Sequence, residues 1–266
     1  MQRFSGCRLE AEISGIADIV LSVAVAAVST IVDESLVVTL DGNAVALREL
    51  MDEHGSRLHC ADGLGPGTLF VDYRVEASGT EESAPVTEID LIRYARPSRY
   101  CESDRLAAFA RAEFVGLSGR ELVDAVTDWV WNRVAYISGS SRPTDGAVAT
   151  MLARQGVCRD FAHLVIAMLR ACDTPARLVS VYAPGLSPMD FHAVVEAHVD
   201  GSWWVTDATG LAPRTAMSRI ATGRDSADTA FLTVAGDTVG LNWLDVTAYT
   251  DGMLPVDDRA QPARLW

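Results

Sequence analysis

The pattern of apolar and polar positions divides the chain into two parts. In the first part, up to about residue 78, short apolar runs are rich in β-branched and aromatic residues. The runs that predict strands are 18–25, 35–40 and 68–75. Turn sequences separate them, notably Asp41-Gly42-Asn43 and the glycine-rich segment 63–67. This pattern predicts a small antiparallel β domain.

Beyond about residue 90 the apolar positions follow the period of helices. Ser118 and Glu121 have the spacing of a capping box, which predicts that a helix begins there. The apolar stripe of that helix consists of Leu122, Val126, Trp129, Val130 and Val134. A second helix is expected from about Thr144 to before Gly156.

A third helix is expected from Cys158 to about Ala171. Its apolar residues are spaced i, i+3, i+4, i+7 and i+8, and they are Phe161, Leu164, Val165, Met168 and Leu169. This spacing buries one face of the helix and places Cys158 in its first turn.

The connection between the two parts is polar and extended. Residues 78–83 predict a loop, and residues 95–100 predict an extended connector, because Pro97 disfavours helical geometry in the residue before it. We therefore place a boundary near residue 90, with an N-terminal β domain over 1–90 and a second domain over 91–266.

Composition and charge narrow the class of protein. With 266 residues, 49% of them apolar and 22% charged, the chain has the composition of a globular protein. All 22 basic residues are arginine, and the net charge of −14 opposes binding to nucleic acid and to anionic membrane surfaces. We expect neither nucleic acid nor a membrane as a partner.

Two further features bear on the cellular compartment. The five cysteines lack CxxC pairs, and their odd number leaves a free thiol in any disulfide scheme, which favours a reducing compartment. The apolar run from Ile19 to Val32 is too short to span a membrane, and Glu10, Glu12 and Asp18 stand where a signal peptide needs positive charge. We expect the run to be buried β structure and the protein to be cytoplasmic.

Cys158 is the candidate nucleophile. An ordinary thiol is mostly protonated at neutral pH, whereas the unpaired N–H groups and the dipole of a helix N-terminus stabilise a thiolate. The same N–H groups can hold the oxyanion that forms when a carbonyl is attacked. The alternative is a buried and inert cysteine, which is the more common role of this residue type.

His192 and Asp207 are candidates for the base and for the acid that orients it. Strands predicted at 191–199 and 202–207 flank Asp200-Gly201, a strong hairpin signal. With a two-residue turn, paired positions sum to 401, so Val194 faces Asp207 and His192 is its diagonal neighbour at about 7–8 Å. A hydrogen bond between the two side chains is then within reach, and the carboxylate would fix the tautomer of the imidazole.

The other histidines fit this chemistry less well. His163 should face away from Cys158 around the helix, as a polar helix residue. His198 sits at the turn end of its strand, where it should be solvated. The remaining two lie in or near turns of the β region and have no partner evident in the sequence; they are His54 and His59.

A zinc site is an alternative use of these side chains. The residues that could be combined into one are Cys158, Cys172, His163 and His192. They lack close pairs such as CxxC or HxxxH, and they would have to come from opposed helix faces. We therefore expect no metal, and the sequence contains no nucleotide-binding motif.

Three segments resemble the bacterial transglutaminase-like superfamily, members of which are also described as cysteine proteases. They are Gly156-Val157-Cys158-Arg159-Asp160-Phe161-Ala162, Phe191-His192-Ala193 and Asp207-Ala208-Thr209. The core of the resemblance runs from about Pro143 to Gly210, and the connector 96–101 and the N-terminal β region resemble those of two-domain members. Three motifs in this order are more specific than any one of them.

The resemblance implies an α+β fold with a papain-like core, preceded by a small all-β domain. In that core the helix bearing Cys158 packs on an antiparallel sheet that presents His192 and Asp207. It also implies acyl transfer on a peptide or protein amide, in which Cys158 attacks the carbonyl, His192 protonates the leaving amine, and a thioester is released to water or to another amine. No cofactor is implied.

The sequence leaves the acceptor of the acyl group open. We favour water, and hence a peptidase or amidase, because a chain without lysine cannot crosslink itself through ε-amines. A transglutaminase that crosslinks other proteins is one alternative, and a non-catalytic binding or scaffold module on the same fold is another. The sequence does not indicate an oligomeric state.

Other residues are candidates for shaping the cleft. Trp131 and Tyr136 are aromatic candidates for its lining. The segment 182–190 leads directly into His192, and we predict that it forms one wall. Gln155 is a candidate donor to the oxyanion, although a glutamine in a loop is usually only solvated.

Overall fold

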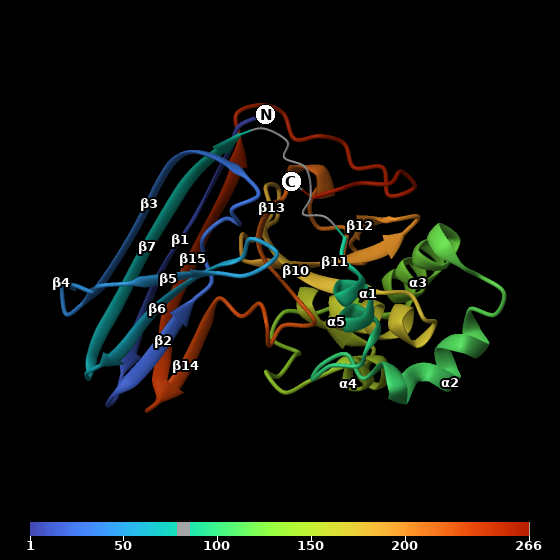
Figure 1. Ribbon diagram of the computed structural model, residues 1–266, viewed down its shortest axis with the longest axis horizontal. Helices are drawn as coiled ribbons and strands as arrows, with labels where there is room; N and C mark the ends of the chain where they lie inside the picture. Colours follow the sequence, from blue (N-terminus) through green and yellow to red (C-terminus); the bar gives the residue numbers. More distant parts are fainter. Residues whose placement is uncertain (79–85, 266) are drawn as a thin grey trace.

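The computed structural model describes residues 1–78 and 86–265 and shows a β-sheet part beside a part that mixes helices and strands (Figure 1). Its helices are α1 (Glu88–Ala95), α2 (Ser103–Glu113), α3 (Gly119–Arg133), α4 (Ala147–Ala153), α5 (Cys158–Ala171) and a 3-10 turn at Arg214–Ala216. The fold is therefore α+β, as expected. From residue 79 on, the loop predicted at 78–83 lies outside the described residues.

Two antiparallel sheets form the β part. The first contains β1 (Arg3–Ile13), β3 (Thr30–Leu40), β4 (Asn43–Ala44), β7 (Gly67–Ser78) and β15 (Val239–Thr250), in the order β15-β1-β7-β3-β4. The second contains β2 (Ala17–Leu21), β5 (Arg48–Met51), β6 (Arg57–Leu64) and β14 (Leu232–Gly236), in the order β14-β2-β6-β5. Alternate residues of β1 and β7 point inward, and a shared core that includes Leu9, Ile19 and Val71 holds the two sheets together.

The β part is not built from residues 1–90 alone. β15 pairs antiparallel with β1 along its whole length, and β14 pairs with β2. Both strands follow the predicted boundary by more than a hundred residues and return to the N-terminal sheets, as the orange and red strands of Figure 1 show. Their sequences did not indicate strands of this domain because most of their side chains are exposed: in β15 only Val246 and Ala248 are buried.

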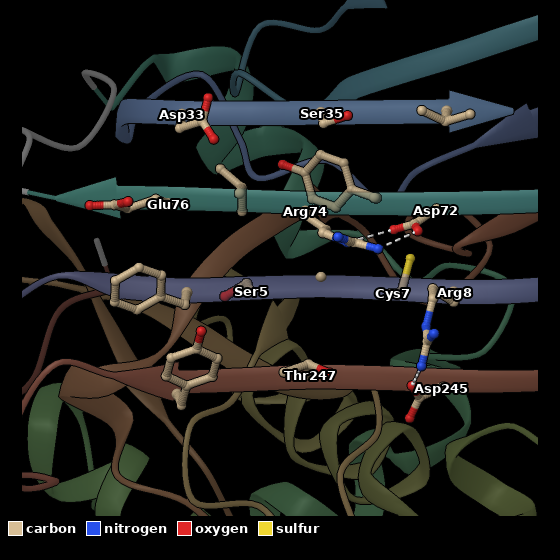
Figure 2. A pocket seen from close by; sticks show the side chains of 16 residues that line it. Ser5, Cys7, Arg8, Asp33, Ser35, Asp72, Arg74, Glu76, Asp245 and Thr247 are labelled. Atoms are coloured by element: carbon tan, nitrogen blue, oxygen red, sulfur yellow. Dashed lines mark hydrogen bonds and ion pairs between the residues drawn. The ribbon is translucent and has the colours of Figure 1, made fainter.

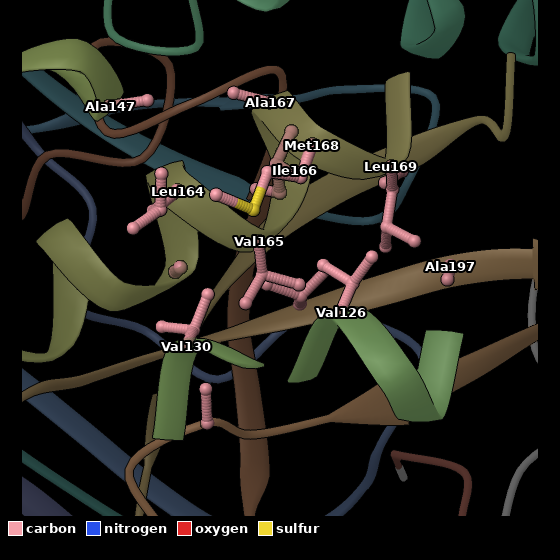
Figure 3. Packing of buried hydrophobic residues seen from close by; sticks show 14 of the residues in the cluster. Val126, Val130, Ala147, Leu164, Val165, Ile166, Ala167, Met168, Leu169 and Ala197 are labelled. Atoms are coloured by element: carbon pink, nitrogen blue, oxygen red, sulfur yellow. The ribbon is translucent and has the colours of Figure 1, made fainter. Parts of the chain in front are cut away.

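The helical part surrounds a third antiparallel sheet. Its strands are β10 (Ala176–Tyr182), β11 (His192–Val199), β12 (Ser202–Thr206) and β13 (Ser218–Gly223), in the order β12-β11-β10-β13. Helix α5 packs on β10 and β11, and α2, α3 and α4 pack against α5. Figure 3 shows the apolar side chains of α5, among them Val165, gathered with Val126 and Val130 of α3. The predicted stripes of both helices are thus the sides that meet in this core.

The third sheet also joins the two parts of the molecule. Tyr182 at the end of β10 is fully buried in the core of the β part, and its hydroxyl donates to the carbonyl of Val23 at 2.8 Å. On the other face of the sheet, Val194 and Val205 pack with Leu265 from the C-terminal segment. The sheet that carries the candidate histidine is therefore buried on both faces.

Some local predictions differ from the structure. The strand predicted at 18–25 ends at Leu21, and the apolar residues after it are buried without being part of a strand. Ser118 is the N-cap of α3 but its side chain makes no capping hydrogen bond, because Gly119, with φ of 55°, departs from helical geometry at the first position. Within the described ranges, no helix combines the length and the apolar character that a membrane crossing requires.

Candidate functional site

A cavity of about 700 Å³ lies where the start of α5 faces the third sheet and the β part. Cys158 from α5, His192 from β11 and Ile220 from β13 line it, together with Ser22 from the loop after β2 and Phe231 just before β14. Two of the candidate residues, Cys158 at the start of α5 and His192 at the start of β11, therefore line the same cleft.

Cys158 is the first residue of α5, and its thiol is free and partly exposed. The helix is capped from within its first turn. The buried carboxylate of Asp160 accepts the backbone N–H of Val157 at 2.8 Å through Oδ2 and the hydroxyl of Ser141 at 2.9 Å through Oδ1. The bond from Val157 to Asp160 holds the turn that presents the thiol. At this end of the helix the dipole favours negative charge.

Gly156 is needed for the same cap. A Cβ at this position would stand 2.6 Å from the Cβ of Asp160. The carbonyl of Gly156 also accepts the N–H of Ile137 at 3.0 Å, which ties the short parallel pair β8 (Ala135–Tyr136) and β9 (Gln155–Gly156) to the nucleophile turn. The motif around the cysteine thus encodes a backbone approach that only glycine permits.

His192 and Asp207 meet in the structure. Nε2 of His192 lies 2.9 Å from Oδ2 of Asp207, and both side chains are buried. The other ring nitrogen, Nδ1, is also buried and has no hydrogen-bond partner among the described residues. One side of the imidazole is therefore held by the carboxylate, and the other is left for the cleft that it shares with Cys158.

The hairpin register that was predicted from the sequence is confirmed. Val195 pairs with Thr206 and Val199 with Ser202, so paired positions sum to 401. The turn residues have positive φ angles of 50° at Asp200 and 76° at Gly201, as a two-residue hairpin turn needs. The ladder stops at Thr206, and Asp207 leaves the strand to reach the imidazole by its side chain.

Thr209 is a residue whose role the sequence did not indicate. Its backbone N–H and its hydroxyl donate to Oδ1 of Asp207 at 2.7 and 2.8 Å. Oδ2 is thereby left for His192. A sequence signal that could have indicated this role is the short polar side chain two residues after an aspartate, which is typical of an Asx-type turn.

The charges of the pair reinforce each other. Burial lowers the pKa of His192, but the charge and the hydrogen bond of Asp207, with a contribution from the neighbouring Cys158 side chain, outweigh it and raise the pKa to about 10. Burial raises the pKa of Asp207, but His192 and the two bonds from Thr209 lower it below its ordinary value. The arrangement therefore favours an imidazolium beside a carboxylate at neutral pH.

Tyr136 lines the cleft beside the nucleophile, as the sequence suggested. Burial and the adjacent Cys158 sulfur raise the pKa of Tyr136 to about 12, while the backbone N–H of Cys158 acts in the opposite direction as a hydrogen-bond donor. The hydroxyl of Tyr136 is thus adjacent to the N–H of Cys158.

The candidate oxyanion donor Gln155 and most of the predicted wall segment 182–190 lie outside the cleft. Gln155 borders a separate hollow of about 260 Å³ with Ser141 and Asp160, on the other side of the nucleophile turn. From the segment 182–190 only Asp190 lines the cleft, because Leu186 and the start of the segment are buried in the core. The walls come instead from Arg99, Tyr100, Arg159 and the segment 226–231.

His163, which the sequence indicated only as a polar helix residue facing away from Cys158, has a structural role. It is fully buried, its Nε2 accepts the N–H of Ser226 at 3.1 Å, and its ring stacks on Tyr100 at 5.3 Å. Burial lowers its pKa to about 3, so the ring is neutral. His163 therefore contacts two segments of the cleft wall, one at Tyr100 and one at Ser226.

A second hollow, of about 650 Å³, lies on the outer face of the first sheet (Figure 2). Four of its charged side chains form two ion pairs, Arg8 with Asp245 at 2.8 Å and Arg74 with Asp72 at 2.7 Å. Cys7, whose sulfur is drawn there, is buried, and burial raises the pKa of its thiol to about 12. This surface lacks an activated nucleophile.

Comparisons with known proteins show a family and a fold that this chain shares. Residues 111–208 match the family model of the transglutaminase-like superfamily. A crystal structure of a Cytophaga hutchinsonii protein, described as "a putative cysteine protease", superposes with a TM-score of 0.86 at 32% identity over 97% of this chain and 94% of that one. The likeness covers the β part as well as the helical part.

Mycobacterial relatives match a smaller portion. An uncharacterized protein of Mycobacterium leprae is 29% identical over 149 residues, which are 51% of this chain and 52% of that protein. An uncharacterized protein of Mycobacterium tuberculosis is 39% identical over 120 residues, 44% of this chain and 31% of that protein. The matched segments thus span about half of the first relative and a third of the second. From the family-model match and the full-length structural likeness, this chain belongs to the transglutaminase-like superfamily.

Proposed function

We propose that this chain is a thiol-dependent enzyme of amide acyl transfer and that its acceptor is water. Cys158 is the nucleophile and His192 transfers the protons. Asp207 orients the imidazole of His192 and stabilises its protonated form. The observation that carries the proposal is the 2.9 Å contact between two buried groups, Nε2 of His192 and Oδ2 of Asp207, on a cleft that also holds a cysteine at a helix N-terminus.

The reaction follows from the charges of these groups. The sulfur of Cys158, as the thiolate, adds to the carbonyl carbon of the amide, and the imidazolium of His192 gives its proton to the leaving nitrogen as the C–N bond breaks. The neutral imidazole then takes a proton from water, whose oxygen adds to the thioester. The C–S bond breaks, the carboxylic acid leaves, and the thiolate and imidazolium are restored.

The oxyanion formed in both steps has donors at hand. The backbone N–H of Cys158 stands at the start of α5, where no helical carbonyl accepts it. The Tyr136 hydroxyl, adjacent to that N–H, supplies a second donor when a substrate oxygen takes its place between them. Such donors act most strongly in a site that excludes water, and each is worth about 10²–10³ in rate.

The charges of the cleft support a peptide or protein amide as the substrate. The whole chain has a net charge of −14. The lining of this cleft nevertheless includes two arginines, Arg99 and Arg159, and one aspartate, Asp190. Arg159 is engaged with Ser141 and with the carbonyl of Arg142, whereas Arg99 lies over the ring of Tyr100. Arg99 is therefore available to a carboxylate near the scissile amide.

Two assays with one peptide set test the proposal. Peptides that carry a fluorescent amide leaving group should be hydrolysed by the parent chain and not by Cys158→Ser, and the rate should not require added amine. A labelled primary amine, offered with the same peptides, should not be incorporated. Incorporation that exceeds hydrolysis would identify a crosslinking transglutaminase, and inactivity of the parent on a broad library, with no reaction at Cys158, would identify a binding module.

A further inference from the structure

A second cluster of chemically reactive side chains lies away from the cleft, where the β part meets helix α1. It consists of Glu53 and His54 in the turn between β5 and β6, and of Asp90 in α1. One ligand atom of each of the three residues lies within 4.8 Å of the others. None of them lines the candidate active site.

The turn that carries the first two residues is held rigidly. One carboxylate oxygen of Asp52 accepts the backbone N–H groups of His54 and Ser56, each at 2.8 Å. Gly55, with a φ of 78°, closes the turn by a bond from its N–H to the carbonyl of Asp52 at 3.2 Å. His54 is 7% exposed, so its imidazole is fixed in a buried position.

Asp90 presents one oxygen toward this turn. Its Oδ2 forms the capping box of α1, in which it accepts the Thr87 hydroxyl at 2.7 Å and the Thr87 N–H at 3.3 Å. Oδ1 is buried and has no hydrogen-bond partner in the described part of the chain, although the residue is only 3% exposed. A buried carboxylate oxygen without a partner is costly unless another group satisfies it.

The distances from His54 to the two carboxylates are close to those of a metal site. Nε2 of His54 lies 3.5 Å from Oδ1 of Asp90 and 3.7 Å from Oε1 of Glu53. Zinc bound to nitrogen and oxygen at about 2.0–2.2 Å in a tetrahedron separates its ligands by about 3.3–3.6 Å. The hydroxyl of Tyr94 lies 2.8 Å from the same nitrogen of His54 and would have to move away from it when a metal binds.

The two carboxylates of the cluster, Glu53 and Asp90, attract a cation. Arg93 contacts Oε1 of Glu53 and lies 4.0 Å from Oδ1 of Asp90, so its guanidinium offsets the two carboxylates. Both Arg93 and Glu53 have side chains that are more than one-third exposed, so they can swing outward and give an ion a path to the buried pair.

We propose that Glu53, His54 and Asp90 bind a divalent transition-metal ion, with zinc as the best-fitting member of the class, and that the ion fastens the β5–β6 turn to helix α1. The imidazole nitrogen and two carboxylate oxygens are ligands that zinc accepts, and the Tyr94 hydroxyl or a water completes the site. The site lies outside the candidate catalytic machinery, and its role is to hold the two parts of the molecule together.

The test uses the full chain with the Cys158→Ser substitution, so that the cleft thiol does not bind metal. After treatment with a chelator and its removal, ZnCl₂ is titrated calorimetrically and CoCl₂ is followed by its visible absorption. We expect one equivalent to bind, a tetrahedral Co²⁺ spectrum, and a higher melting temperature with zinc than without. His54→Gln should weaken zinc binding by about 100-fold or more, since even residues behind a metal ligand contribute 10–100-fold.

Two further variants keep the result interpretable if His54→Gln does not fold. Glu53→Gln changes a half-exposed side chain and should also weaken binding, whereas Arg93→Ala removes the competing cation and should tighten it several-fold. His198→Gln, which alters a histidine elsewhere, should leave zinc binding unchanged. Absence of a binding event, or zinc binding that Glu53→Gln and Arg93→Ala both leave unaltered, overturns the proposal.

Discussion

His192 and Asp207 are fifteen residues apart in the chain, yet Nε2 of the first lies 2.9 Å from Oδ2 of the second. The contact is possible because the two strands pair about a two-residue turn and β12 ends one residue before the aspartate. Thr209 then fixes the rotation of the carboxylate. The short hairpin therefore brings the two groups together.

Asp207→Asn tests this relationship. The amide retains the shape of the carboxylate but removes its charge, so the pKa of His192 should fall from about 10 and the imidazolium should be lost near neutral pH. We expect kcat to fall by about 10²–10⁴, as removal of the orienting acid does in triads. Steady-state kinetics and an NMR titration of the His192 ring measure the two effects. Asp245→Asn, in β15 of the first sheet, is the matched control. An unchanged titration of His192 in Asp207→Asn would contradict our interpretation.

The reactivity of the cysteines provides a second prediction. Iodoacetamide at pH 6.5 should modify Cys158 at least about tenfold faster than Cys172, because the imidazolium of His192 and the start of α5 stabilise the thiolate. Burial raises the pKa of Cys172 above its ordinary value, although its side chain is partly exposed and therefore reachable. Mass spectrometry of peptides after timed quenching measures the two rates. Equal rates would show that Cys158 is not activated.

Tyr136→Phe distinguishes two roles of this side chain, the hydroxyl as a donor to the oxyanion and the ring as part of the cleft lining. The ring is kept and only the hydroxyl is lost, so we expect kcat to fall by about 10–100-fold with little change in KM. Trp131→Phe is a useful control, because this exposed aromatic does not line the cleft. If Tyr136→Phe raised KM and left kcat intact, the hydroxyl would instead bind the substrate in its ground state.

Gly156→Ala should damage the nucleophile turn. The added Cβ would meet the Cβ of Asp160 at 2.6 Å, and Asp160 cannot move away without releasing the N–H of Val157. We expect a loss of about 1–3 kcal/mol in the free energy of unfolding, which is typical of overpacking, together with loss of activity. Urea denaturation measures the first. Gly65→Ala, where a Cβ has open space, should be close to neutral.

The buried carboxylate of Glu196 predicts how stability depends on pH. It lies between Arg177, at 2.7 Å, and Arg219, at 2.5 Å. Burial opposes ionisation, but the two arginines lower the pKa of Glu196 from 4.5 to about 2. Because the folded-state pKa is depressed, the stabilisation is fully present above about pH 4.5 and is lost as the pH falls toward 2.

Glu196→Gln should therefore destabilise the chain at pH 7 by about 3–5 kcal/mol, since it leaves two buried guanidinium groups without a counter-charge. Urea denaturation from pH 7 to pH 3 should also show a shallower acid loss in this variant than in the parent. Asp245→Asn breaks an exposed pair and should leave the free energy of unfolding nearly unchanged. A parent and a Glu196→Gln variant with the same acid dependence would refute the assignment.

The sequence was most informative where a signal is local. The apolar stripe that begins at Phe161 determined α5 and hence the position of Cys158 at its first residue, because a 3.6-residue period leaves one face to bury. The Asp200-Gly201 turn determined the hairpin register and so brought His192 within reach of Asp207, because strand pairing on either side of a short turn has only one register.

Contacts between distant segments were decided by the tertiary structure alone. β14 and β15 complete sheets that begin more than two hundred residues earlier, and their mostly exposed side chains give no local signal of that pairing. The same holds for the cleft walls, for the burial of His163, and for the meeting of His54 with Asp90. Local periodicity shows which face of an element is buried, but which other element covers that face depends on packing across the whole chain.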